Sequence, residues 1–462
     1  MGFLSWFSGA PIGDQSYQGE AEQVFENNDD EYVLYGSELS VYSQKVESAL
    51  RFGRFNYKYE TFSLSKRQAV QNRSGTHKIP QLKTPNNWII SDSTPVLKYL
   101  DGYSATPMFP TGPTGIVVYL IEEFLDEWNV RNIGCLRWAN DVSAMYSVQM
   151  LVHELVSDWW PYWLFKSYIM NYLLNFGMKV NRAFGVSTES QERLCEVKAR
   201  ELLVHLNDQL QTTKFALGNK PCAVDASLIG WLRSCILDDP YGKSLVADLN
   251  EVRNYGQLGD DPSFWTDDGG LGKLVAFPKT TTFANYCLIQ MGGAYRRFAL
   301  NNRKAVNDRA KSFMSVVKRE EISFKTKTYT EKSRRMLARH IDVTMANCTA
   351  AERQAIQGYP IGQSPIGPKL ASIPVERFGD VGAVDRHGIF DERLCNTLEA
   401  ADSYRPSSFR ANFNAACPQG CSPLSKSQQG ARLYSQYLNT HRFYSVDYDS
   451  AMQPASEAAV AH

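Results

Sequence analysis

The sequence shows no excess of either charge and no long apolar segment. Lys and Arg together number 49, as do Asp and Glu, so the charge gives no indication of a nucleic-acid partner or of an anionic membrane surface. The most apolar stretch, residues 159–178, is interrupted by Pro161 and Lys166, whereas a membrane-spanning helix needs about 18 uninterrupted apolar residues. We therefore expect a globular protein that neither spans a membrane nor binds nucleic acid.

The N-terminal region also lacks basic residues, because no Lys or Arg precedes Lys45. A cleavable mitochondrial presequence is rich in Arg and poor in acids, so the acidic residues between positions 20 and 30 argue against one. The nine Cys residues are scattered along 462 residues without a secretory signal. This usage is typical of reduced cysteines and predicts an intracellular protein.

A metal site is not expected from the cysteines of the C-terminal region. Cys417 and Cys421 are separated by three residues, but Cys395 and His441 lie at wide and irregular distances from them. Structural zinc sites have short, regular ligand spacings. We predict no metal here, and interpret Cys417 and Cys421 as a reduced pair or a local disulfide.

The composition changes along the chain and predicts four segments. Residues 1–30 form an N-terminal extension with a small apolar cluster, and residues 31–103 form a mixed domain of strands and helices. A linker rich in Pro and Gly precedes residues 114–345, which have mainly helical spacing. Residues 346–462 contain many Pro and Gly without sustained periodicity, so they predict an extended tail that lacks a core of its own. The aromatic run at 159–165 is more typical of a packed core than of a lipid- or partner-facing patch.

The mixed domain has a readable order of strands and helices. Strands are expected at 32–35 and 57–62, a helix at 43–54, and a hairpin formed by 80–83 and 88–90. Ser93 is expected to cap a further helix that has Pro95 in its first turn. A second capping pair, Thr328 with Glu331, predicts the start of a basic helix near residue 328.

Several short motifs of these segments resemble those of glutathione transferases. Ile79-Pro80 and Asp92-Ser93 are similar to the cis-Pro and acid-Ser positions of the family's N-terminal domain, and residues 40–46 are similar to its loop before the first helix. Residues 218–225 resemble a short box in the family's second domain. The resemblance implies an α+β protein, in which a thioredoxin-like N-terminal domain precedes an all-helical C-terminal domain, followed by an irregular C-terminal extension.

The resemblance also implies catalytic candidates. The family activates the thiol of glutathione with a hydroxyl or thiol group near the start of the first helix, because a hydrogen bond and the helix N-terminus both favour the thiolate. Ser40 lies where family members keep this group, and Tyr42 and Ser43 are further hydroxyls in reach. The alternative is that Ser40 only caps the helix.

The implied glutathione-binding residues are Ile79, Pro80, Asp92 and Ser93. A cis bond before Pro80 would expose the backbone of Ile79 to the cysteinyl part of glutathione. The helix start at Ser93 would bind the γ-glutamyl carboxylate, and Asp92 would meet the ligand's ammonium. The same residues also have a purely structural interpretation, since they shape the fold.

Two departures from the family pattern keep two functions open. Val41 replaces a Pro that would fix the loop after Ser40, and Cys222 replaces a Ser or Thr helix cap. These changes and the two extensions favour a structural or accessory subunit, peripheral to a larger complex such as a mitochondrial membrane complex, whose protein subunits contact the extensions. The intact binding motif favours an active, cytosolic glutathione transferase, which would be a homodimer.

Overall fold

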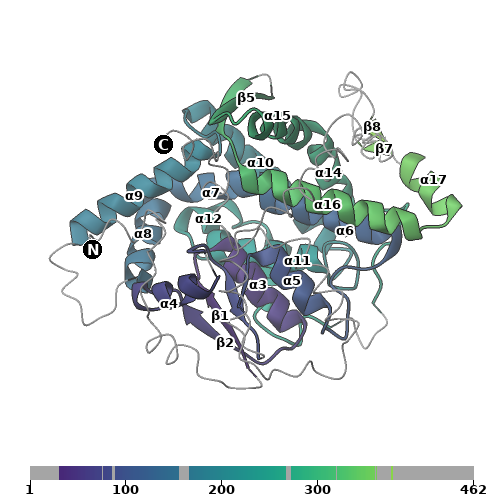
Figure 1. The fold of residues 1–462 in the computed structure, drawn as a ribbon, viewed down its shortest axis with the longest axis horizontal. Helices are drawn as coiled ribbons and strands as arrows, with labels where there is room; N and C mark the ends of the chain where they lie inside the picture. Colours follow the sequence, from purple (N-terminus) through teal and green to yellow (C-terminus); the bar gives the residue numbers. More distant parts are fainter. Residues whose placement is uncertain are drawn as a thin grey trace, which may run out of the picture.

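The computed structural model describes residues 31–74, 76–85, 89–155, 166–266, 272–318, 320–358, 360–361 and 376–377. The described residues up to Asp101 form a four-stranded sheet with helices on both faces. Those that follow form a mainly helical layer beside it (Figure 1). The elements of the first part are β1 (Tyr32–Gly36), α3 (Val41–Phe52), β2 (Tyr57–Thr61), α4 (Leu64–Ser74), β3 (Gln81–Lys83), β4 (Ile89–Ser91) and α5 (Ser93–Asp101).

The sheet has the strand order β2-β1-β3-β4. β1 and β2 are parallel and α3 forms the crossover between them, whereas β3 is antiparallel to both β1 and β4. Parallel strands need such a crossover, while β3 and β4 can form a direct hairpin. This arrangement confirms the predicted thioredoxin-like domain and its hairpin.

The two faces of β1 pack against different helices. Leu34 belongs to the large core that includes α3 and α5, whereas Val33 and Tyr35 belong to a smaller cluster with Val70 of α4. Successive side chains of a strand point to opposite faces of the sheet. The almost continuous apolar sequence of β1 therefore reflects a strand that is buried on both sides.

The second part is mainly helical, and within its described residues three π-helical segments continue α-helices. Its elements are α6 (Gly112–Glu123), η1 (Phe124–Asn129), α7 (Val130–Trp138), α8 (Asp141–Leu155), α9 (Lys166–Ala183), α10 (Glu189–Leu210), α11 (Ala223–Trp231), η3 (Leu232–Ile236), α12 (Pro240–Leu245), α13 (Asn250–Leu258), α14 (Thr282–Gln290), η4 (Met291–Tyr295), α15 (Arg296–Asn307), β5 (Ser312–Val317), β6 (Glu320–Lys325), α16 (Thr328–Asn347) and α17 (Ala350–Gly358).

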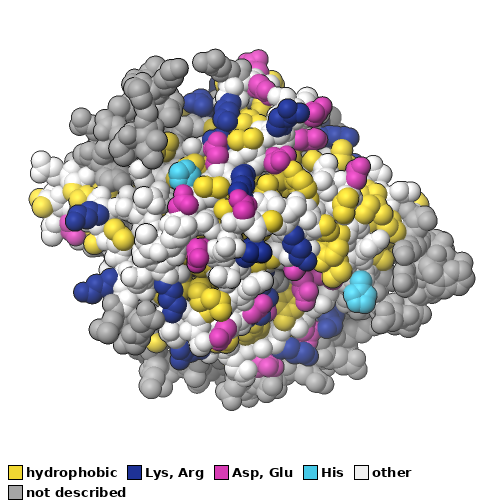
Figure 2. Space-filling view, turned by 180° about the vertical axis from the view of Figure 1, so that it is seen from behind, with side chains coloured by type: hydrophobic (Ala, Val, Ile, Leu, Met, Phe, Trp, Pro, Cys, Tyr) yellow, Lys and Arg dark blue, Asp and Glu magenta, His cyan; other side chains and the backbone are white. Residues whose placement is uncertain are grey.

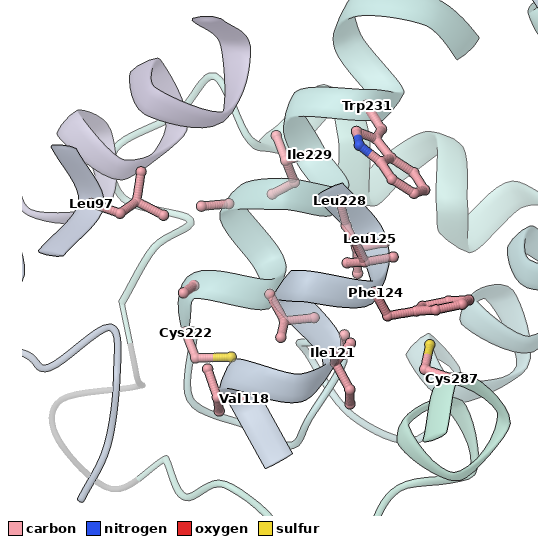
Figure 3. Packing of buried hydrophobic residues seen from close by; sticks show 14 of the residues in the cluster. Leu97, Val118, Ile121, Phe124, Leu125, Cys222, Leu228, Ile229, Trp231 and Cys287 are labelled. Carbon is pink, nitrogen blue, oxygen red and sulfur yellow. The ribbon is translucent and has the colours of Figure 1, made fainter. Parts of the chain in front are cut away.

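Helix α11 lies in the centre of the core and joins the two parts. All of its residues are buried, and Leu228 lies beside Leu125 of η1 (Figure 3). Its Gly230 lies against α3, because a Cβ at this position would be 2.6 Å from the backbone nitrogen of Lys45. The two parts therefore share one core, which depends on a glycine where their backbones meet.

The structure corrects the expectation of an all-helical second part. β5 and β6 form an antiparallel hairpin between α15 and α16. Alternate residues of β6 are buried, among them Ile322 and Phe324, which pack in the main core. This alternation is the pattern of a half-buried strand, and it lies inside a region whose average spacing is helical.

The predicted capping pair of Thr328 and Glu331 is also wrong. The N-cap of α16 is Lys327, which makes no side-chain capping bond. Glu331 instead accepts hydrogen bonds from the guanidinium groups of Arg334 and Arg335, at 2.7–2.9 Å. The carboxylate is drawn to these cations one turn further along, so it does not reach the helix start.

The first residues of the predicted C-terminal tail are helical. Ile356 of α17 is 3% exposed and belongs to the main core. Two short strands follow, β7 (Pro360–Ile361) and β8 (Glu376–Arg377), which pair with each other. The rest of the tail, the N-terminal extension, the aromatic run at 159–165, Cys417 and Cys421 lie outside the described residues.

The surface of the described part carries mixed charge. Figure 2 shows acidic and basic side chains interspersed over one face, with apolar side chains between them. In the portions of the chain that the structure covers, no helix combines the length and the apolar character needed to cross a bilayer.

Candidate functional site

The bond between Ile79 and Pro80 is cis, as the sequence predicts. It immediately precedes β3, and the carbonyl of Pro80 accepts a hydrogen bond of 3.1 Å from the backbone nitrogen of Asp92. The cis-Pro turn and the start of α5 are therefore joined directly. Two of the predicted glutathione-binding motifs lie side by side in the structure.

Ser40 is the N-cap of α3. Its Oγ accepts a hydrogen bond of 3.3 Å from the backbone nitrogen of Ser43, and its backbone is extended, as in most N-caps. The cap interpretation of Ser40 is thus confirmed, and the residue is only partly buried. A catalytic role for the same hydroxyl stays a prediction.

The other two hydroxyl candidates make structural contacts. The Tyr42 hydroxyl donates to the backbone carbonyl of Asp126 at 2.9 Å, and burial together with nearby carboxylates raises the pKa of this phenol well above its ordinary value. Ser43 is fully buried, and its Oγ accepts from the backbone nitrogen of Ser37 at 3.3 Å. Both side chains connect parts of the fold, and of the three candidates Ser40 is the one best placed to meet a ligand.

Asp92, rather than Ser93, caps α5. Its Oδ1 accepts a hydrogen bond of 2.6 Å from the backbone nitrogen of Ser93, which is the first helical residue and is 1% exposed. Asp92 has a φ of 82°, in the left-handed region that Asp tolerates better than most residues. This turn swings its carboxylate over the helix start, which is why the predicted Ser93 cap is wrong.

The second oxygen of Asp92 is engaged by a distant helix. The hydroxyl of Tyr329, in the first turn of α16, donates to Asp92 Oδ2. Burial raises the pKa of Asp92, although hydrogen bonds from Tyr329 and Ser93 and the charge of Lys332 oppose this rise. Burial in turn lowers the pKa of Lys332 well below its usual value, an effect that Asp92 counters. The acid expected to meet a ligand's ammonium therefore already faces a hydroxyl and an amine of its own chain.

A buried charge cluster lies between α3 and the segment formed by α6 and η1. Lys45 Nζ is 2.5 Å from both Glu122 Oε1 and Asp126 Oδ2, and Thr94 Oγ1 donates to Glu122 at 2.8 Å. Burial and the neighbouring Glu122 raise the pKa of Asp126 to about 8 against the opposing charge of Lys45. This cluster fixes the thioredoxin-like part against the helical part.

Two more acids of the same segment hold α16 in place. Glu123 accepts hydrogen bonds of 2.5 Å from the hydroxyls of Tyr295 and Ser333. Burial raises the pKa of Glu127 to about 7, while a hydrogen bond with Thr330 lowers it. These acids therefore interact with hydroxyl groups of the protein itself. Within the described ranges, no group of three or more metal-ligating side chains is arranged to hold a metal ion.

The box at residues 218–225 stabilises the start of α11. Asp225 Oδ2 accepts from the backbone nitrogen of Cys222 at 2.8 Å, and Oδ1 accepts from Ala216 N at 2.9 Å and from the Tyr255 hydroxyl at 2.7 Å. Asp225 is thus the acid of a capping box with Cys222 at this helix start.

Comparison with protein families agrees with this arrangement. Residues 34–107 match the family model described as "Glutathione S-transferase, N-terminal domain". Over this segment the chain is similar to the N-terminal domain of glutathione S-transferases. No curated protein matches the sequence.

Solved structures of glutathione transferases are similar to about half of the chain. A transferase from Rhodospirillum rubrum F11 is 14% identical, with 55% of this chain and 98% of that chain covered and a TM-score of 0.34. Gtt2 from Saccharomyces cerevisiae is 11% identical, with coverages of 50% and 98% and a TM-score of 0.33. A transferase from Methylobacillus flagellatus KT, solved with glutathione bound, is 15% identical, with coverages of 51% and 98% and a TM-score of 0.31.

Proposed function

We propose that this protein acts mainly as a structural or accessory subunit of a larger protein assembly, built on the glutathione transferase fold. The observation that carries the proposal is the contact between Tyr329 and Asp92. A working transferase needs this acid for its ligand, whereas here both carboxylate oxygens accept hydrogen bonds from the protein. The site contributes to the stability of the fold in place of binding.

The catalytic hydroxyls support the same proposal. Conjugation requires the thiolate of glutathione, which is scarce at neutral pH because a free thiol has a pKa of about 8.5. Tyr42 and Ser43 are bonded within the protein, and Ser40 serves α3 as a cap. With Val41 after it, Ser40 lacks the Pro that would set its loop.

The extensions are the proposed contacts with partner proteins. The predicted tail, residues 346–462, carries many Pro and Gly and has scattered aromatic residues. Such a segment gains order by laying its aromatic side chains on a surface that is already folded. We assign the protein to the periphery of an assembly such as a mitochondrial membrane complex, on the basis of these extensions.

The second candidate is a glutathione-dependent transferase that acts as a cytosolic homodimer. The cis bond before Pro80, the buried Ser93 at the start of α5, and the position of Ser40 favour it. In this case glutathione would be bound by Ile79, Pro80, Asp92 and Ser93, and its thiol would lie near Ser40.

Measurements of native size and of catalytic activity distinguish the two candidate functions. We expect the full chain, tagged in its own cells and extracted mildly, to migrate well above its mass of 52.2 kDa and above a dimer. A variant that ends after residue 358 keeps the buried Ile356 and should migrate as a free protein. A full chain that migrates only as a monomer or dimer would exclude the accessory role.

The activity assay uses glutathione with a generic electrophile. We expect turnover close to that of the uncatalysed reaction, and no difference between the wild type, Ser40→Ala and the exposed control Ser312→Ala. Robust turnover that is lost in Ser40→Ala and kept in Ser312→Ala would establish the transferase instead.

A further inference from the structure

The first turn of α16 places a hydroxyl and an amine beside Asp92, the acid that is expected to bind a ligand's ammonium. The hydroxyl of Tyr329 donates to Asp92 Oδ2, and the amine of Lys332, one helical turn later, is near enough to interact electrostatically with the same carboxylate. Residues three apart on a helix share one face. The same helix face therefore presents a hydrogen-bond donor and an amine to one acid.

Contacts on both sides of Tyr329 set the position of this turn. Asn302 of α15 holds the residue before the helix through two hydrogen bonds, from Lys327 N at 2.8 Å and to Lys327 O at 2.9 Å. On the far side, Ser333 donates to Glu123 at 2.5 Å. The contact of Tyr329 with Asp92 therefore belongs to a built interface between α16 and the rest of the site.

The turn is held by these polar contacts rather than by a side-chain cap or by apolar packing. Its N-cap, Lys327, makes no side-chain capping bond. Most of the apolar packing of α16 lies further along, where Leu337 and Ala338 belong to the main core. The first turn can therefore open locally while the rest of the helix stays packed.

We propose that the start of α16 is an internal competitor of glutathione, in which Tyr329 and Lys332 take the place of the ligand's ammonium on Asp92. The proposal rests on the assignment of Asp92 and Ser93 as the glutathione site under the second candidate function. It holds whether or not the protein also serves in an assembly, because the competition lies within one chain.

The strength of the Tyr329 hydrogen bond predicts how much this contact weakens the binding of glutathione. Glutathione can pair with Asp92 only after the hydrogen bond of Tyr329 is broken, and a hydrogen bond to a charged group contributes about 1.5–3 kcal/mol. Removal of the Tyr329 side chain should therefore tighten glutathione binding by roughly 10- to 100-fold, since 1.4 kcal/mol is a factor of ten.

The experiment is a calorimetric titration of glutathione into the full chain. Four variants accompany the wild type: Tyr329→Ala, Tyr329→Phe, the double variant Tyr329→Ala/Asp92→Asn, and the control Val343→Ala on the exposed face of the same helix. Asn keeps the capping ability of Asp but removes its charge. Circular dichroism checks that each variant is folded.

We expect weak binding to the wild type and to Val343→Ala, and clearly tighter binding to Tyr329→Ala. Tyr329→Phe should lie between, because the ring remains while the hydrogen bond is lost, and the double variant should lose the gain. Equal binding by the wild type and Tyr329→Ala, or no binding by any variant, overturns the proposal. Neither result changes the native size on which the accessory role depends.

Hydrogen exchange gives a second readout that needs no substitution. Saturating glutathione should speed the exchange of backbone amides at 328–333 and leave those at 337–347 unchanged. Unchanged or slower exchange at 328–333 in the presence of bound glutathione would contradict the displacement of this turn.

Discussion

Replacing Lys45 by Met is the most direct test of how the two parts of the protein are joined. Lys45 is 1% exposed and its ammonium lies 2.5 Å from both Glu122 and Asp126. Burial alone would lower the pKa of Lys45, but the two carboxylates outweigh it and raise this pKa. The side chain is therefore charged, and Met has a similar length without the charge.

The expected loss of stability follows from the two acids that remain. Breaking a buried ion pair by removing one partner costs about 3–5 kcal/mol, because the other charge is left uncompensated. At roughly 2–4 °C per kcal/mol for a domain of 150–250 residues, the melting temperature should fall by roughly 6–20 °C.

The loss should depend on pH. The pKa of Asp126 is raised to about 8 in the folded protein, from about 3.9 in an unfolded chain. A group with a raised pKa contributes stability that is fully present below its unfolded pKa and is lost as the pH rises through its folded pKa. Without Lys45 the pKa of Asp126 rises further, so Lys45→Met should lose more stability at pH 8 than at pH 5.

Thermal unfolding followed by circular dichroism at pH 5 and pH 8 measures both effects. The control is Lys58→Met, because Lys58 also pairs with a glutamate, Glu60, but is 60% exposed. A surface substitution of this kind should change stability by less than about 0.5 kcal/mol. If Lys45→Met lost no more than Lys58→Met, or lost more at pH 5 than at pH 8, the assigned role of the cluster would be wrong.

Three further substitutions test single contacts by thermal unfolding. Gly230→Ala should cost about 1–3 kcal/mol through its clash with the backbone of Lys45, whereas the open position Gly134→Ala should cost nothing; equal effects would refute the close approach. Ser40→Ala should cost about 0.5–2 kcal/mol as a lost cap, and a neutral result would count against the cap. Asp225→Ala should cost about 3 kcal/mol or more, since three buried donors lose their acceptor; a smaller loss would show that water replaces the carboxylate.

The thioredoxin-like part was predictable because its signals are local. The strand at 32–36, the helix after Ser40 and the turn at Pro80 each follow from residues within a few positions of one another. Asp92 and Ser93 mark the limit of such reasoning. Both residue types are good N-caps, so the sequence places a cap at this point without deciding which residue provides it.

The contacts on which the proposals rest were not predictable, because their partners are far apart in the sequence. Tyr329 and Asp92 are separated by 237 positions, and Lys45 and Asp126 by 81. Hydrophobic periodicity identifies helices and their buried faces, but it carries no information on which polar groups of two helices meet. The hairpin β5–β6 was not predicted for a related reason, since its short alternation of apolar and polar residues is surrounded by helical spacing.

The long separation of Tyr329 from Asp92 has a consequence for the protein while it is being made. A ribosome adds about 5–20 residues per second, so the 237 positions between the two residues correspond to about 12–47 s of synthesis. For most of this time the residues of the thioredoxin-like part, which ends with α5 at Asp101, have been made, and those of α16 have not. The hydrogen bond from Tyr329 to Asp92 can therefore form only after the other elements of the site have been synthesised.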